Sequence, residues 1–239
     1  SQPTLLDTRE HVRAFVRWGD TGAAWSEPQD PSVNGMRAPL ALLAARAEDE
    51  EAVRCLGEGC TGRLVEFAPI PNSEAIFIIK RDGWAQSRHS LYVWDTTSQQ
   101  MRRLLSTDAI VRMCSLTADA AICLYEDSLA PRRVVRVSLR NGAVTTLFDA
   151  NPNLALNAFL PARRLEWDLP RGMQGYGYLI EPPGRRRPRP LIVVQYRAGG
   201  FLRGGVGDEY PVQAFAREGF AVLVLERSES ADAIRLDGD

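Results

Sequence analysis

Short apolar segments recur up to about residue 155 and are separated by polar residues or by Gly, Pro, Asn and Asp. This spacing is typical of an all-β domain. The stretch 41–52 has helix-forming composition, but its context favours a strand followed by an acidic turn. The expected strands are 38–46, 63–68, 75–80, 90–95, 101–105, 109–116, 120–126, 133–139 and 143–148.

One pattern of strand, polar turn and strand occurs twice. Tyr92 in SLYVWDTTSQQMRRLL matches Val135 in RVVRVSLRNGAVTTLF, 43 residues later, and Leu104 matches Leu147 at the same offset. A period near 40–45 residues with about four strands per unit is typical of a β-propeller blade. With a more degraded unit upstream, residues 1–155 are predicted to form a partial β-propeller of about three blades. A generic β-sandwich is the alternative.

The pattern changes from about residue 156. The run LIVVQY (191–196) is apolar and β-branched, as expected of a strand buried on both faces. A glycine-rich loop follows, and then a short amphipathic helix is expected at 211–218, with proline at its start and glycine after its end. The run FAVLVLE (220–226) is a second buried strand. Strand, helix and strand in this order predict a βαβ unit, and therefore an α/β domain in 156–239.

The four cysteines form two close pairs in the sequence. Cys55 and Cys60 bracket a short loop, whereas Cys114 and Cys123 lie on the two arms of an expected hairpin. Cross-strand Cα atoms lie about 4.5–5.5 Å apart, a distance that a disulfide can bridge. Two local disulfides favour an exported or periplasmic protein over a cytoplasmic one. Four buried, reduced thiols are the alternative, and the spacings match no zinc motif, so no metal is expected.

The composition narrows the function classes. Apolar residues make up 45% and charged residues 25%, as in ordinary globular proteins. The net charge of −1 gives no basic field for nucleic acid, and no apolar run approaches the roughly 18 residues of a membrane span.

His89 is expected in a loop, without a partner that would make it a general base. The large aromatic side chains are expected to pack between blades: Trp84, Tyr92, Trp94 and Trp167. The sequence leaves the oligomeric state open.

The succession of apolar strand, tyrosine, glycine-rich loop, helix and apolar strand resembles the start of the hydrolase domain of serine peptidases of the prolyl oligopeptidase family. GFLRGGVGDEYPVQAFAREGFAVLVLER, LFDANPN and the cysteine-containing strands resemble the lasso-peptide isopeptidase branch of that family. The resemblance covers roughly residues 35–227 and is strongest in 191–226. It implies a propeller followed by the first strands of an α/β-hydrolase domain, no cofactor, and a peptide substrate, which in that branch is a threaded lasso peptide.

The resemblance also implies a role for the tyrosine that follows the third sheet strand. Tyr196 occupies this place, where the family supplies a hydroxyl that stabilises the oxyanion of the reaction. The implied oxyanion loop contains Gly199, Gly200, Arg203, Gly204 and Gly205. A tyrosine that only packs at a strand end, followed by a plain flexible loop, is the alternative.

A catalytic triad is not found in these residues. The family implies a Gly-x-Ser-x-Gly nucleophile followed by Asp and His. After Tyr196 the only serines are Ser228 and Ser230, which lack the flanking glycines, and no histidine follows His89. We therefore expect an internal fragment of a serine peptidase or isopeptidase that is inactive alone. The alternative is a non-catalytic propeller binding module with a vestigial α/β tail.

Overall fold

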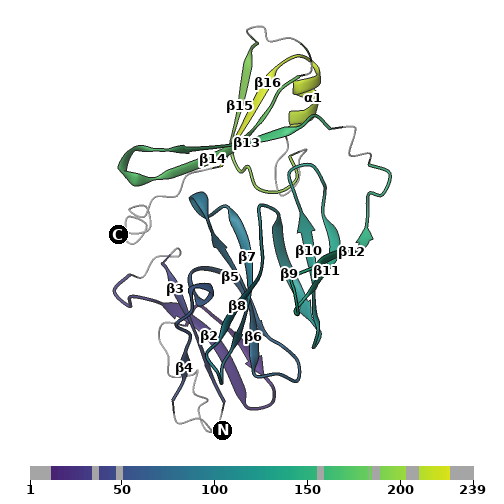
Figure 1. Ribbon diagram of the computed structural model, residues 1–239. Helices are drawn as coiled ribbons and strands as arrows, with labels where there is room; N and C mark the ends of the chain where they lie inside the picture. The colour runs from purple at the N-terminus through teal and green to yellow at the C-terminus, as the bar shows by residue number, and fades with distance from the viewer. Residues whose placement is uncertain are drawn as a thin grey trace.

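The protein is mostly β-sheet, with one short α-helix among the residues described. The computed structural model describes residues 12–33, 38–46, 51–154, 159–182, 184, 189–202 and 210–226, without the side chains of Arg171 and Tyr196. Its strands form three sheets, of which the third lies above the other two in Figure 1. Within these residues, no helix combines the length and the apolar character needed to cross a membrane.

The first sheet has eight strands and the second has four. The first runs β1-β2-β3-β5-β6-β7-β8, with β4 paired to β3, and the second runs β12-β11-β10-β9. The strands of the first sheet are β1 Ala14–Trp18, β2 Gly22–Pro28, β3 Leu40–Ala45, β4 Val53–Arg54, β5 Thr61–Pro69, β6 Ala75–Asp82, β7 Arg88–Asp95 and β8 Met101–Thr107. Those of the second are β9 Ile110–Leu116, β10 Ala120–Glu126, β11 Arg133–Ser138 and β12 Val144–Asp149. Short 3-10 turns occur at η1 Glu58–Cys60 and η2 Trp84–Gln86. The nine predicted strands are confirmed, whereas β1, β2 and β4 were not predicted as individual strands.

The sequence repeat corresponds to two four-stranded antiparallel units, β5–β8 and β9–β12. Tyr92 lies in the third strand of the first unit and Val135 in the third strand of the second. The pairing register shifts between Leu91 and Tyr92 in one unit and between Val134 and Val135 in the other. The irregularity therefore recurs at the 43-residue offset, so the repeat extends to the local geometry of the strands.

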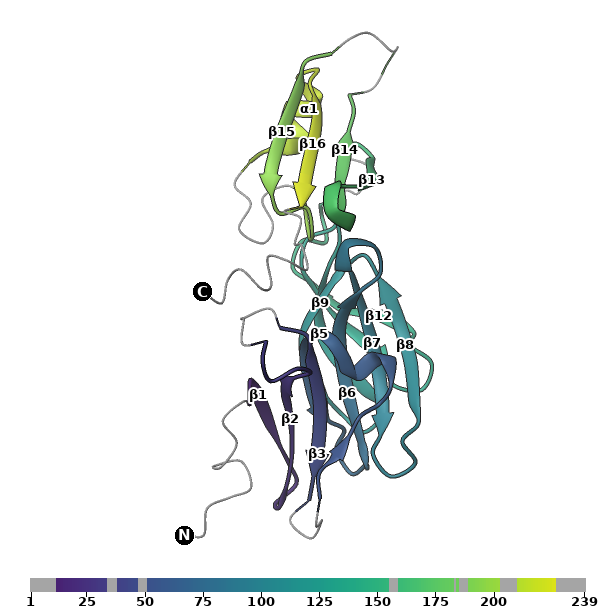
Figure 2. The same cartoon turned by 90° about the vertical axis from the view of Figure 1, so that its left-hand side faces the viewer.

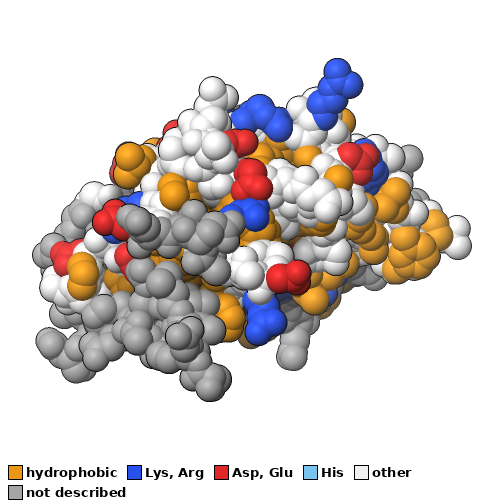
Figure 3. Space-filling model, turned by 90° about the horizontal axis from the view of Figure 1, so that it is seen from below, with side chains coloured by type: hydrophobic (Ala, Val, Ile, Leu, Met, Phe, Trp, Pro, Cys, Tyr) orange, Lys and Arg blue, Asp and Glu red, His pale blue; other side chains and the backbone are white. Residues whose placement is uncertain are grey.

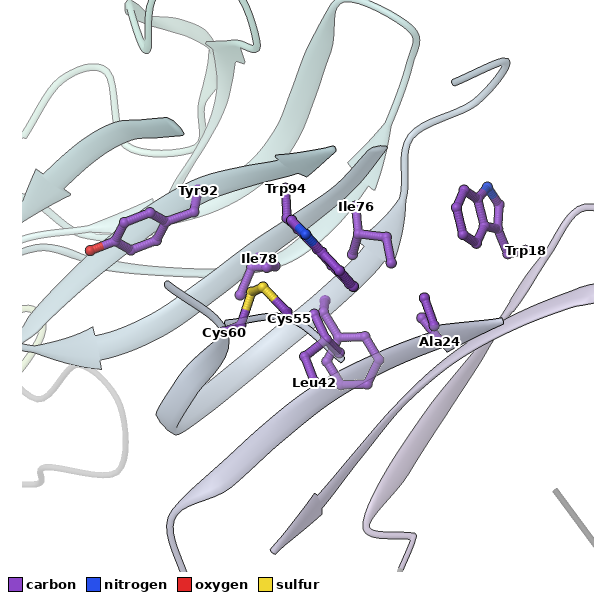
Figure 4. Close-up of a cluster of buried hydrophobic side chains, with 11 residues drawn as sticks. Trp18, Ala24, Leu42, Cys55, Cys60, Ile76, Ile78, Tyr92 and Trp94 are labelled. Carbon is purple, nitrogen blue, oxygen red and sulfur yellow. A yellow bond between two sulfur atoms is a disulfide. The ribbon is translucent and has the colours of Figure 1, made fainter. Parts of the chain in front are cut away.

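Both faces of the central unit are buried. Alternate residues of β6 point to opposite faces, so Ile76 and Ile78 join a core formed with β1–β3, whereas Phe77 and Ile79 join a core formed with β9–β11. Figure 4 shows the first core, in which Trp94 and Leu42 lie close to the Cys55–Cys60 disulfide. The continuous apolar run of β6 thus follows from coverage on two sides.

Both predicted cysteine pairs form disulfides. The Cα atoms are 5.8 Å apart in Cys55–Cys60 and 4.2 Å apart in Cys114–Cys123. The second pair differs from the regular hairpin pair that was expected, because the register shifts between Ile122 and Leu124 and Cys123 lies opposite a bulge in β9. Disulfides persist in oxidising compartments, so the two bridges favour such an environment.

His89 is buried inside β7, so the prediction of a loop position is wrong. It pairs with Arg81 of β6 on one side and Thr107 of β8 on the other, which keeps this polar segment extended. Its Nδ1 lies 2.9 Å from the carbonyl oxygen of Val111 and 3.1 Å from the Val111 nitrogen. His89 therefore links the first unit to β9 of the second, and burial lowers the pKa of its imidazole.

A second link between the units is a glycine. Gly142, in the turn between β11 and β12, has φ +73°, which favours glycine. A Cβ at this position would collide with the carbonyl group of Leu104 in β8. The turn of the second unit therefore packs directly on the last strand of the first.

The outer strand of the second unit, β12, carries exposed apolar side chains. Val144, Leu147 and Phe148 of β12 are all exposed, Phe148 by 62%. In Figure 3, hydrophobic side chains gather at the right-hand edge of the molecule, the side on which β12 lies in Figure 1.

The third sheet runs β13-β14-β16-β15 and contains the only parallel pair in the described residues. Its elements are β13 Ala162–Asp168, the 3-10 turn η4 Pro170–Gly172, β14 Gln174–Ile180, β15 Leu191–Tyr196, α1 Val212–Arg217 and β16 Ala221–Glu226. The two predicted strands are confirmed as parallel neighbours, and α1 lies on one face of the sheet (Figure 2). The prediction that 191–196 is buried on both faces is wrong: Leu191 and Val193 are exposed, because α1 and the core of this sheet cover only the other face of β15. The helix ends at Arg217, and the glycine expected after its end is Gly219, with φ +100°; the N–H of Phe220 donates to the carbonyl of Phe215.

Candidate functional site

The candidate site lies at the carboxyl ends of the parallel strands β15 and β16. Tyr196 is the last residue of β15 and pairs with Glu226, the last residue of β16. One face of the two strands, with Val194 of β15 and Val222 and Val224 of β16, packs in the core of this sheet, and β15 ends at Tyr196. The carboxyl ends of adjacent parallel strands are where α/β sheets place their ligands.

The loop after Tyr196 is only partly described. Ala198 is fully buried and Gly200 has φ +87°, a conformation that favours glycine. Gly199 does not need glycine for its φ, and a Cβ there would make ordinary contacts with Ile110 and Tyr176. Arg203, Gly204 and Gly205 lie outside the described residues, as does the side chain of Tyr196.

Glu226 holds the start of this loop. Its Oε2 accepts hydrogen bonds from the backbone N–H of Ala198 at 2.6 Å and of Gly199 at 3.3 Å. A carboxylate that accepts backbone N–H groups forms charge-assisted bonds, which are stronger than neutral ones. Sequence analysis did not identify Glu226, because the pairing depends on the register of the two strands.

Tyr176 of β14 lies beneath the loop. Its side chain is buried, and burial, reinforced by the negative charge of Glu226, raises the pKa of its hydroxyl. The guanidinium of Arg164 stacks on the Tyr176 ring, 4.6 Å from the centroid. Tyr176 is therefore a neutral, packed side chain at neutral pH and supports the loop as a platform.

The third sheet contacts the first through the turn η2. The indole Nε1 of Trp84 donates to the carbonyl of Gly175 at 2.8 Å, and the N–H of Ala85 donates to Gln174 at 2.9 Å. Trp84 thus packs on the third sheet, so its predicted place between blades is wrong. The reason is the turn Gly83–Ser87, which projects the indole beyond the end of β6. Trp167 likewise lies in the third sheet, where its indole covers Gly175.

Arg164 extends this contact between sheets. It donates to Ser87 Oγ at 2.5 Å and forms ion pairs with Asp108 at 3.3 Å and Glu166 at 2.8 Å.

No group of three His, Cys, Asp or Glu side chains suited to a metal ion occurs in the described ranges.

The architecture defines the class of protein first. The fold of three sheets with few helices is shared with solved peptidase structures: a dipeptidyl peptidase 4 of Porphyromonas gingivalis superposes with a TM-score of 0.64 at 15% identity, covering 92% of this chain and 33% of that chain. A putative dipeptidyl aminopeptidase IV of Bacteroides ovatus gives a TM-score of 0.61 at 12% identity, covering 90% and 33%. At such identities the likeness shows the fold alone.

The sequence supplies the closer relationship. The lasso peptide isopeptidase AtxE2 of Asticcacaulis excentricus is 32% identical over 233 residues, which cover 95% of this chain and 32% of the isopeptidase. The solved structure of AtxE2 without ligand gives a TM-score of 0.79 at 30% identity, covering 90% of this chain and 32% of that chain. No family model matches the chain. The resemblance seen in the sequence is confirmed: this chain is a homologue of a lasso peptide isopeptidase and spans about a third of its length.

Proposed function

We propose that the chain is part of a serine isopeptidase that opens the ring of lasso peptides. The observation that carries the proposal is the 32% identity to a lasso peptide isopeptidase across 95% of the chain. A structure of an AtxE2 variant has the peptide Astexin3-dC4 bound, which supports a lasso peptide as the substrate class.

Within this proposal, residues 1–155 form part of a β-propeller and 156–239 the first part of an α/β-hydrolase domain. The two repeated four-stranded units support the first assignment, and the parallel pair β15 and β16 with its crossover helix supports the second. The propeller would restrict access to a site at the carboxyl ends of β15 and β16. The two disulfides support an exported or periplasmic location.

Tyr196 is the oxyanion donor in this proposal. Hydrolysis of the isopeptide bond requires a serine hydroxyl to add to the carbonyl, after which the amine leaves and water releases the acid. The negative oxygen formed on the way needs a donor, and a single such donor contributes about 10²–10³-fold in rate. The position of Tyr196 at the end of β15, beside the last residue of β16, supports this role.

The nucleophile is proposed to lie outside residues 1–239, because these residues contain no Gly-x-Ser-x-Gly sequence and no histidine after His89. The test compares the 239-residue chain with the protein from its complete reading frame. We expect a fluorophosphonate probe to label the complete protein and not the chain, and the complete protein to convert a lasso peptide into its linear form with the gain of one water. Labelling of the chain itself would overturn the proposed location of the nucleophile.

The alternative, a binding module with a vestigial α/β tail, predicts a different pair of results. The reading frame would end without a serine elbow, and the probe would label neither protein. A lasso peptide incubated with either one would then remain threaded.

A further inference from the structure

We propose that Glu226 is a positioning residue, which fixes the loop after β15 and through it the place of the Tyr196 hydroxyl. This inference rests on the proposed function, since it assigns a role within the same site. It identifies a carboxylate that acts on the reaction only through its neighbour and contacts no reacting atom.

The hydrogen bonds of Glu226 define the path of the chain directly after Tyr196. The two N–H groups that it holds belong to the second and third residues after the tyrosine. Tyr196 and Glu226 are also partners in the parallel pairing of β15 and β16. The backbone of Tyr196 is therefore held by the strand pairing, and the chain that follows it is held by the Glu226 side chain. Hydrogen bonds from backbone N–H groups to a carboxylate are charge-assisted and stronger than those to a neutral acceptor.

Other contacts hold the far part of the described loop. The N–H of Leu202 donates to the carbonyl of Ser128, which follows β10 in the second sheet, at 3.2 Å. Gly199 lies against Ile110 and Tyr176. Removal of the Glu226 carboxylate would therefore release the N–H groups of Ala198 and Gly199 at the near end of the loop while the contact of Leu202 remains.

The same contact also decides which groups are available to a substrate. The N–H groups of Ala198 and Gly199 would otherwise suit an anionic oxygen, but both already donate to Glu226. These two N–H groups are therefore not available to a substrate, and within the proposed function the oxyanion role stays with Tyr196. Loss of the carboxylate would therefore displace the tyrosine, and a displacement of about 1 Å can cost about 10²-fold in rate.

The experiment uses the protein from the complete reading frame and measures kcat and KM for lasso peptide hydrolysis. E226A is expected to lower kcat by about 10–100-fold with little change in KM. E226Q is expected to retain most of the rate, because an amide oxygen still accepts both N–H groups. E181A is the matched control, since Glu181 follows β14 with its side chain 61% exposed, and should keep the wild-type rate. If E226A does not fold, E226D takes its place, because it keeps the charge and shortens the reach.

A double variant separates positioning from a general structural effect. If Glu226 acts through Tyr196, then E226A combined with Y196F should be no slower than Y196F alone. Multiplied losses, a full rate in E226A, or an equal loss in E226Q would each overturn the inference and leave the proposed function standing. Failure of the wild-type protein to open any lasso peptide would instead overturn the proposed function. A full rate in Y196F would overturn the oxyanion role of Tyr196 and this inference with it.

Discussion

The two repeated units, β5–β8 and β9–β12, share a sequence pattern and differ in their surroundings. The first lies between two cores, so its strand β6 is buried on both faces, whereas the second has a covered inner side and an exposed last strand. Leu105 of β8 packs against the second core, while the equivalent Phe148 of β12 is 62% exposed. The comparison shows that burial in this array is set by neighbouring units and not by the repeat itself.

The largest expected effect is the difference in unfolding free energy between two Phe→Ala substitutions. Phe77 is fully buried between the units and Phe148 is exposed. Phe77→Ala should lower the free energy of unfolding by about 3–5 kcal/mol, because it leaves a cavity in a core that cannot collapse. Phe148→Ala should change it by less than about 0.5 kcal/mol. Urea unfolding followed by near-ultraviolet circular dichroism measures both, and equal losses would contradict the asymmetry.

The next effect concerns the disulfide of the less covered unit. Replacement of Cys114 and Cys123 by alanine opens a loop with a sequence separation of 9 residues. Loop entropy alone then predicts a loss of about 2–3 kcal/mol. The same exchange at Cys55 and Cys60, separated by 5 residues, should cost slightly less. Thermal melts of the two double variants and of the wild type test this order, and a stability unchanged by either exchange would refute it.

The smallest effect depends on pH and tests the link between the units. Burial is the main cause that holds the pKa of His89 below its unfolded value of 6.5, and the nearby Arg81 and Arg112 add to it, against the opposing bond to Val111. The unfolded chain therefore takes up the proton first as the pH falls. The contribution of His89 to the free energy of unfolding is therefore fully present above about pH 6.5. Below that pH it declines, by at most about 1.4 kcal/mol per pH unit.

The matched variant is His89→Gln, which removes the titration. The difference in unfolding free energy between wild type and variant should shrink as the pH is lowered from 7 to 5, as measured by urea titrations at each pH. A difference that stays constant or grows would show that the folded protein binds the proton as readily as the unfolded chain.

The periodic parts of the fold could be predicted and the parts set by neighbours could not. The apolar runs of β6, β10 and β15 identify strands by their length and β-branched composition, although β15 is covered on one face only, with Leu191 and Val193 exposed. The segment of β2, GAAWSEP, contains little contrast between apolar and polar residues, so it gave no separate signal. His89 appeared to be a loop residue because its immediate neighbours are polar, while strands distant in sequence are what bury it.

The candidate site also contains one feature that could be predicted from the sequence and one that could not. The position of Tyr196 follows from the end of an apolar run, which the sequence displays. The contact between Glu226 and the loop depends on which residues of β15 and β16 stand side by side, and no local pattern encodes that register. The exposed row on β12 could not be predicted, since its sequence matches that of the covered strand β8.

The close approach of Gly142 to Leu104 has a consequence for how the array responds to stress. A turn that fits against its neighbour without room for one methyl group transmits any displacement of β8 to the β11–β12 hairpin. We therefore expect the two units to unfold together in one all-or-none transition. A larger residue at position 142 should separate the two units and allow them to unfold at different denaturant concentrations.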